Sequence, residues 1–398
     1  MSVEKISDKC LGCTLCLNIC PTKAISVFVN KNQEEYVKVD DNKCIQCGKC
    51  EKLCPVFDML NIKSSNQLRC AYSAYAKEEY TKKSSSGAVF YSIAKNSLDR
   101  NWYICGAVYT DHYRSVKHIL TNKITDVMMM RGSKYVQSSI RDLYYDFKNI
   151  LNNAENIILF CGTPCQCAAI KSFFSKYINR IYLIELVCNG CMPPIILRKD
   201  IEEIELNNGS SVENYTMRYK YESYFPIFKK VDLKNGKNIV EDFYKTDIGA
   251  IYGSRICLRK CCYHCQYKGL NRIGDITLGD YKGFSVEGNN EHPIFGESMV
   301  LVNSKKGTDL INILRDTDGV IIRKAISLKD VIISNNRLII QGFSPSKYEK
   351  NKFLKSINSK TIKELREAVN KYSTRKYVIT RKIYEKVQVM RALIENEF

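Results

Sequence analysis

Apolar runs with two different periods alternate along most of this chain. Short runs typical of β-strands occur at residues 70–76, 102–109, 156–160, 181–187, 215–233, 275–278, 299–302 and 319–322. Longer segments with helical spacing separate several of them, at residues 87–98, 138–151 and 164–175. Strands that alternate with helices predict a mixed α/β domain in which some strands pair in parallel.

Different patterns at the two ends predict two further parts. Residues 24–30 and 35–39 alternate apolar and polar positions around a short polar turn, which predicts a β-hairpin. A polar linker follows at residues 61–67, and the last fifty residues are charged and helical in pattern. We therefore predict an α/β (α+β) chain with three domains, at residues 1–60, 68–345 and 346–398.

Residues 377–394 combine an apolar stripe with a basic face. Such a helix can rest on a membrane surface or on a partner, but a packed C-terminal helix is the favoured interpretation.

The N-terminal part contains two copies of the spacing Cys-x2-Cys-x2-Cys-x3-Cys-Pro, 34 residues apart. In bacterial ferredoxins this run binds 4Fe-4S clusters, and its fourth cysteine binds the other cluster. A zinc site also uses Cys-x2-Cys pairs, but eight cysteines this densely spaced and duplicated favour iron and sulfur. We assign the first cluster to Cys10, Cys13, Cys16 and Cys54, and the second to Cys44, Cys47, Cys50 and Cys20.

Composition narrows the setting in which such clusters work. The 398 residues include nineteen cysteines without a secretory signal or a long apolar stretch, so we expect a reducing cytoplasm and an anaerobic host. The net charge of +19 fits an acidic redox partner such as a ferredoxin, although a lysine-rich genomic composition explains it equally well. Without a nucleic-acid-binding motif, the charge does not predict binding to nucleic acid.

Further cysteines lie in three separate segments of the predicted α/β domain. Thr163 and Pro164 predict the start of a helix whose first turn holds Cys165, where the helix dipole favours a thiolate. A third iron–sulfur cluster is the favoured function, a zinc site with His264 is the alternative, and unrelated buried cysteines are the simplest explanation. Cys70, Cys105 and Cys167 are expected in the core. The candidate ligands of the third cluster are Cys165, Cys188, Cys262 and Cys265.

Three polar segments predict a site for a phosphorylated cofactor, although the sequence has neither a P-loop nor a Gly-x-Gly-x-x-Gly run. Residues 81–87 gather hydroxyls before a helix, where free amide groups favour anions. Residues 131–138 combine two cations with a glycine and hydroxyls, and residues 274–281 place Asp275 and Asp280 around a strand. Any of these can be an ordinary turn, but together they suit a flavin with a pyrophosphate.

Taken in order, these segments resemble the coenzyme F420 hydrogenase/dehydrogenase beta-subunit family preceded by a two-cluster ferredoxin domain. The resemblance rests on residues 84–87, 131–138, 162–166, 257–265 and 275–280. It implies FAD, a further 4Fe-4S cluster beside it, and Cys165, Cys188, Cys262 and Cys265 as that cluster's ligands. It also implies flavin contacts from Ser85, Ser86, Gly87, Gly132, Ser133 and Lys134. Residues 189 and 217–224 depart from the family pattern, which affects the substrate pocket.

The expected function is that of an iron–sulfur flavoprotein oxidoreductase. Electrons from a ferredoxin-like donor would pass through the clusters to FAD and on to a small-molecule hydride acceptor, with Lys134 as the candidate catalytic residue. A subunit that only relays electrons to a partner enzyme is the alternative, and a zinc scaffold that binds polyanions is a third.

Overall fold

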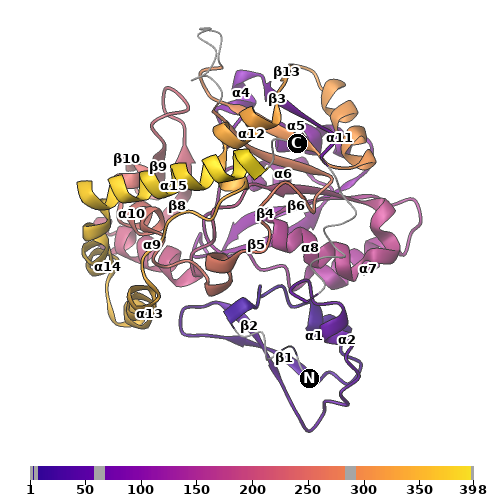
Figure 1. The fold of residues 1–398 in the computed structure, drawn as a ribbon, viewed down its shortest axis with the longest axis horizontal. Helices are drawn as coiled ribbons and strands as arrows, with labels where there is room; N and C mark the ends of the chain where they lie inside the picture. The colour runs from indigo at the N-terminus through magenta and orange to yellow at the C-terminus, as the bar shows by residue number, and fades with distance from the viewer. Residues whose placement is uncertain (1–2, 4–7, 58–67, 283–292, 396–398) are drawn as a thin grey trace.

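The computed structural model describes residues 3, 8–57, 68–282 and 293–395. The linker predicted at residues 61–67 and the predicted end of the first domain at residue 60 lie outside the described residues. Figure 1 shows a small N-terminal part below a large central sheet, with the C-terminal helices along one side. The division at residues 60, 68 and 345 therefore stays a prediction, while the order of the three parts is as expected.

The N-terminal part is a ferredoxin-like domain built on the predicted hairpin. Strands β1 (Ile25–Val29) and β2 (Glu35–Val39) pair antiparallel, with Ile25 opposite Val39. Helices α1 (Leu15–Ile19) and α2 (Lys49–Lys52) each carry the third cysteine of one copy of the motif.

The backbone repeats with the same period of 34 residues as the cysteines. Gly12 and Thr14 have φ angles of 66° and 55°, and Gln46 and Gly48, at the equivalent positions, have φ angles of 51° and 69°. These left-handed residues tighten the loop between successive cysteines, so that three thiols can face one point. The duplication is therefore present in the backbone conformation as well as in the sequence.

The central domain contains an eight-stranded mixed sheet within the described residues. Its strands in spatial order are β13 (Val320–Ala325), β3 (Cys70–Ala76), β12 (Glu297–Val302), β11 (Ile276–Tyr281), β7 (Ile181–Leu186), β6 (Ile158–Gly162), β4 (Tyr103–Thr110) and β5 (Ser115–Thr121). Strands β11, β7, β6 and β4 are parallel to their neighbours in that group, and the outer pairings are antiparallel. This confirms the expected mixed α/β sheet.

Alternate side chains of the sheet enter two different cores. On strand β6, Ile158 and Phe160 pack against α7 (Leu143–Leu151) and α8 (Pro164–Phe173). Leu159 and Cys161 face the opposite core, which contains α5 (Val89–Asp99), α6 (Ile124–Met130) and α11 (Lys305–Arg315). The period of two along a strand therefore explains why the sheet is covered on both faces.

A smaller antiparallel sheet and several helices complete the central domain. The sheet consists of β8 (Val212–Tyr219), β9 (Phe228–Leu233) and β10 (Asn238–Asp242). The remaining α-helices are α4 (Glu78–Thr81), α9 (Pro194–Asn208), α10 (Asp247–Ser254) and α12 (Leu328–Ser334). Its short 3-10 helices among the described residues are η2 (Ser175–Arg180), η3 (Phe243–Lys245), η4 (Lys260–His264) and η6 (Asn336–Leu338), while η7 (Ile357–Ser359) and η8 (Asn370–Ser373) lie in the C-terminal tail.

One predicted helix begins later than expected. The helix predicted at residues 138–151 begins at Leu143. Ser139 instead accepts a backbone hydrogen bond from His118 and donates one to Val116, at 2.9 and 3.1 Å. Pairing with strand β5 therefore keeps the start of this segment extended.

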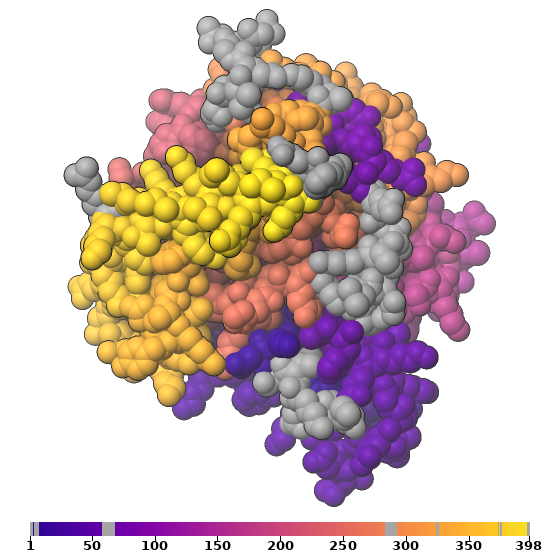
Figure 2. All heavy atoms as spheres, in the orientation of Figure 1, coloured from indigo at the N-terminus to yellow at the C-terminus, as the bar shows by residue number. Residues whose placement is uncertain are grey.

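The C-terminal tail is helical, as predicted, but its last helix exposes its aliphatic stripe. The tail comprises α13 (Lys347–Ser356), α14 (Ile362–Val369) and α15 (Arg375–Glu395), and Figure 2 shows α15 across the surface. Helix α15 buries Ala392 and packs Tyr377 on Phe343, with ring centroids 5.4 Å apart. Among the described residues, no helix has the length and apolar character needed to span a membrane. The exposed stripe consists of Ile379, Ile383, Val387, Met390 and Ile394.

A buried guanidinium joins the ferredoxin-like domain to the central domain. Arg259 is 3% exposed, and its Nη2 donates to the carbonyls of Cys10 and Glu35 at 3.3 and 3.2 Å. Its Nη1 donates to Gln137 and lies 3.9 Å from the buried Glu34. Gly12 is needed beside it, because a Cβ there would lie 2.6 Å from Gln137.

We expect Arg259→Met to lower the free energy of unfolding of the holoprotein by about 3–5 kcal/mol, because it leaves Glu34 buried without a nearby cation. Anaerobic urea unfolding, followed by circular dichroism, measures this change. Lys260→Met is the matched control, because Lys260 is exposed and pairs with the exposed Asp8 at 2.6 Å. An equal loss in both variants would contradict the role given to Arg259.

Candidate functional site

The predicted ligands of the first cluster come together in the core of the ferredoxin-like domain. Cys10, Cys16 and Cys54 are buried there, and burial raises the pKa of the Cys16 thiol to about 12, with smaller contributions from Cys10 and Cys54. Burial also raises the pKa of Cys13 well above its usual value, and the same three thiols add to it. Four thiols that influence one another in this way fit the donor set of a cubane cluster.

The predicted ligands of the second cluster lie closer to the surface. Cys20, Cys44 and Cys50 pack partly buried against the same small core, while Cys47 is exposed. The backbone amide of Ala24 donates to Cys20 Sγ at 3.3 Å. The second site is therefore the more accessible one.

The central domain gathers six cysteines at the ends of three elements. They follow strand β7, lie in the first turn of α8, or lie in and after η4. The thiol of Cys165 interacts with Cys188, Cys261 and Cys265, and that of Cys262 with Cys261, Cys191 and Cys188. The structure thus brings the four predicted residues together and adds Cys191 and Cys261, which the spacing did not single out. We call this inner cysteine set Cys165, Cys188, Cys191, Cys261, Cys262 and Cys265.

The backbone around Cys165 is as predicted, but the expected stabilisation of its thiolate by the helix terminus is outweighed. Thr163 and Pro164 do begin α8, and the Thr163 amide donates to Gln166 Oε1 at 3.0 Å. Burial nevertheless raises the pKa of the Cys165 thiol, and the hydrogen bond with Thr163 only partly opposes it. Desolvation therefore outweighs the helix terminus in the free thiol.

Other predicted positions have simple surroundings. Cys105 and Cys167 are fully buried and Cys70 is half-buried, in keeping with core roles. His264, the zinc alternative's extra ligand, is exposed. Within the described ranges, no three His, Cys, Asp or Glu side chains form a group that could hold a single metal ion.

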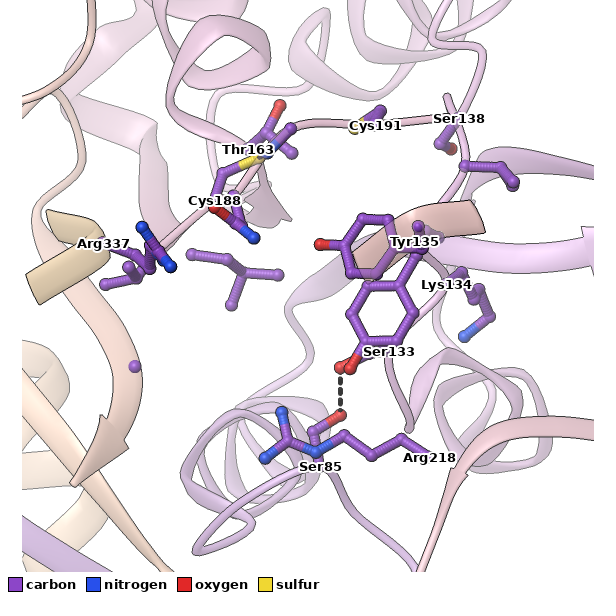
Figure 3. A pocket seen from close by; sticks show the side chains of 18 of the residues that line it. Ser85, Ser133, Lys134, Tyr135, Ser138, Thr163, Cys188, Cys191, Arg218 and Arg337 are labelled. Carbon is purple, nitrogen blue, oxygen red and sulfur yellow. Dashed lines mark hydrogen bonds between the residues drawn. The ribbon is translucent and has the colours of Figure 1, made fainter. Parts of the chain in front are cut away.

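A cavity of about 820 Å³ connects the inner cysteine set with the predicted cofactor segments. Its walls include Ser84–Ser86, Arg131–Ser138 and Leu11–Cys13, the last from the first cluster-binding loop. Figure 3 shows Ser85 and Ser133 facing each other, with their hydroxyls 2.8 Å apart, and Cys188 above them. A volume of this size is typical of sites for cofactors and drug-sized ligands.

The predicted flavin contacts divide into cavity-lining and supporting residues. Ser85, Ser86, Gly132, Ser133 and Lys134 line the cavity. Gly87 instead supports the loop: its amide donates to Ser298 Oγ at 2.9 Å, and a Cβ would lie 2.3 Å from the Ala74 carbonyl. Only glycine fits so close to another strand.

The Lys134 amine turns toward its own loop. Its Nζ donates to the carbonyls of Met130, Arg131 and Gly132 at 3.3, 3.1 and 3.3 Å, at the end of α6. Burial lowers its pKa to about 7. A cation at the carboxyl end of a helix stabilises that end, so Lys134 fixes the loop that carries Ser133.

Lys220 holds the loop at residues 81–87 through hydrogen bonds to its backbone carbonyls. It is 1% exposed, and its Nζ donates to the carbonyls of Thr81 and Ser86 at 2.7 Å each, and to that of Phe295.

The two aspartates predicted around a strand both bond to other residues of the protein. Asp275 accepts from Ser304 at 2.6 Å, while Asp280, which lines the cavity, pairs with Arg218 at 2.9 Å.

Apart from Arg131, which lies in one of the predicted polar segments, the arginines of the cavity were not predicted as site residues. They come from segments far apart in the chain, including the C-terminal tail, so no local motif marks them. Asp280 is the one carboxylate among the described residues that line the cavity. The cavity-lining arginines are Arg131, Arg218, Arg255, Arg259, Arg337, Arg366 and Arg381.

His118 forms part of the cavity wall beside strand β6. It is 5% exposed, and its ring nitrogens contact Ser138 Oγ at 2.7 Å and the Cys161 carbonyl at 3.0 Å. Burial lowers its pKa to about 4, so the ring is neutral near pH 7.

The stability contributed by neutral His118 should be complete above pH 6.5 and decrease as the pH falls toward 4, because the unfolded chain then binds the extra proton. Between pH 6.5 and 5 we expect a loss of about 2 kcal/mol. Unfolding at several pH values measures it. His118→Gln should remove this part of the pH dependence and the exposed His112→Gln should keep it; parallel profiles for all three proteins would contradict the assignment.

The duplicated motif and its grouped thiols define an iron–sulfur protein of the kind that transfers electrons. Residues 9–57 match the family model of the 4Fe-4S dicluster domain. Residues 156–327 match the family model for the C-terminal part of the beta subunit of coenzyme F420 hydrogenase/dehydrogenase. The chain thus carries an N-terminal 4Fe-4S dicluster domain followed by a segment that matches this C-terminal family, which confirms the resemblance in these two segments.

A solved structure of the F420-reducing NiFe hydrogenase complex from Methanosarcina barkeri, obtained with xenon, contains a similar chain. The similarity covers 75% of this chain and 92% of the other, with 15% identity and a TM-score of 0.46. A search of curated proteins found no match.

Proposed function

We propose that this chain is an iron–sulfur flavoprotein oxidoreductase. It takes single electrons from a ferredoxin-like donor and delivers them as hydride to a small-molecule acceptor. The observation that carries the proposal is the continuous cavity, which reaches from Ser85 and Ser133 past the inner cysteine set to the loop around Cys13. Bound clusters supply one-electron steps, and bound FAD combines two electrons with a proton.

The cysteines would hold three clusters. Eight belong to the dicluster domain, and Cys165, Cys188, Cys262 and Cys265 are the proposed ligands of the third. Tyr267 supports a short path between the sets: burial raises the pKa of its hydroxyl well above the usual value, and thiols of both sets, Cys165, Cys13, Cys265 and Cys54, add to the shift. The Tyr267 hydroxyl also donates to the Pro55 carbonyl at 3.1 Å, which holds the two domains together there.

Hydroxyls and backbone amides of the two polar loops would hold the flavin. Ser85, Ser86, Gly132 and Ser133 offer these groups to the cavity, and the nearby Arg131 suits a pyrophosphate. Lys134 would act by positioning Ser133, given its three bonds to backbone carbonyls. We therefore propose it as a positioning residue rather than as the catalytic residue expected from the sequence.

An acidic one-electron carrier is the proposed donor. The net charge of +19 favours an acidic partner. Cys47 in the second cluster motif is exposed, so the dicluster domain is the proposed docking surface.

The second candidate function is that of a subunit that relays electrons to a partner enzyme and has no substrate of its own. The family description as a beta subunit favours a chain that passes electrons to a separate enzyme. Reduction of a dye without any small-molecule acceptor, together with stable co-purification of another subunit, would support this candidate.

We expect anaerobically purified protein to contain about twelve irons per chain, four for each of three clusters, and one FAD. Cys165→Ser should reduce the iron content to about eight, while Cys70→Ser should leave it unchanged. Colorimetric iron analysis and flavin absorbance measure both quantities. Zinc in place of iron, or twelve irons in Cys165→Ser, would contradict the assignment of the inner cysteine set.

We expect Lys134→Met to weaken FAD retention about tenfold and to leave the iron content unchanged, because the variant frees the loop that carries Ser133. Equilibrium dialysis against FAD measures the affinity. Lys123→Met, an exposed lysine before the same helix, is the control. Unchanged FAD affinity in Lys134→Met would show that this loop does not hold the flavin.

A further inference from the structure

Two arginines line the cavity close to the C-terminal tail and have N–H groups without hydrogen-bond partners among the described residues. Arg255 is 3% exposed, and its Nη1 donates to the Asn189 carbonyl at 2.8 Å. Its Nε and Nη2 are buried without a hydrogen-bond partner among the described residues. Arg337 donates from Nη2 to Glu385 at 2.7 Å, and its buried Nη1 likewise has none.

The two guanidinium groups converge on one place. A Cβ added to Gly342 would lie 2.5 Å from Arg337 Nη1 and 3.2 Å from Arg255 Cζ. Both arginines line the cavity, and Arg366 and Arg381 of the tail line it too. Figure 3 places Arg337 across the cavity from Ser133 and Lys134, with Cys188 between them.

Like charges this close repel each other, so the arrangement needs a counter-charge. Glu385 balances the charge of Arg337 through Nη2, which leaves Arg255 without a carboxylate among the described residues, and Asp280 in the cavity wall is already paired with Arg218. The planar fork of arginine matches carboxylate and phosphate oxygens.

We propose that Arg255, Arg337 and Arg381 form a binding site for the oxyanion of the hydride acceptor, a small molecule that carries a phosphate or carboxylate group. The inference rests on the proposed function and adds the chemical class of the acceptor. Arg337 and Arg381 lie beyond residue 327, outside the segment that matches the family. The proposed acceptor site therefore includes residues of this chain that the matched segment does not contain.

The test is isothermal titration of anaerobically purified, full-length protein with inorganic phosphate and with citrate. At least one of them should bind, and Arg337→Gln and Arg381→Gln should each weaken that binding tenfold or more, which is about 1.4 kcal/mol per tenfold. Arg391→Gln, an exposed arginine on the same helix α15, should bind like the unchanged chain. Iron and FAD content are measured on every sample.

Three results would overturn the proposal. The first is absence of binding of both anions, or binding that the two variants leave unchanged. The second is loss of iron in the variants with anion affinity intact, which would assign the arginines to the charge of the inner cluster. The third is loss of FAD in parallel with loss of anion binding, which would assign them to the flavin's own pyrophosphate. A sample without iron or FAD that still binds the anion through Arg337 would refute the proposed function but support the site.

Discussion

The arrangement of the whole electron-transfer region depends on the buried side chain of Arg259. It starts just before η4, whose residues Cys261 and Cys262 belong to the inner cysteine set, and reaches the carbonyl of Cys10 in the first cluster loop. A charge buried at 3% exposure needs hydrogen bonds to offset the loss of water, and Arg259 makes them through Nη1 and Nη2. The bonds of these two nitrogens therefore also fix the first cluster motif against the inner set.

This constraint explains why the interface is formed by backbone carbonyls of the cluster motif. Tyr144 donates to the Cys13 carbonyl and Ser172 to the Leu53 carbonyl, both at 2.7 Å. Carbonyls beside the cysteines have fixed positions once the motif is folded, so they orient the domain without occupying the thiols. The two cysteine sets are thus joined through backbone groups, which keeps them at a constant separation.

Sequence patterns predicted those features that repeat or are local. The duplicated cysteine motif, the hairpin and seven of the eight described strands of the main sheet follow from spacing within a few residues, and the structure confirms their positions. Strand β5 was not predicted. The late start of α7 was missed because Ser139 pairs with β5, some twenty residues away. The contacts of Lys134 could not be predicted for a related reason, since only the folded chain shows that its amine reaches three carbonyls of its own loop.

Only one end of the cavity could be predicted from local sequence patterns. Its cysteine end lies within segments that have recognisable motifs, near Cys165 and Cys188. Its other end combines Arg255 with Arg337 and Arg381, single arginines that ordinary surface helices also contain. These arginines come to line one cavity only when the tail folds over the central domain. Among the described residues that line this cavity, no carboxylate is free to pair with them. The cysteine segments thus have local sequence signals, whereas the proposed acceptor site depends on tertiary packing.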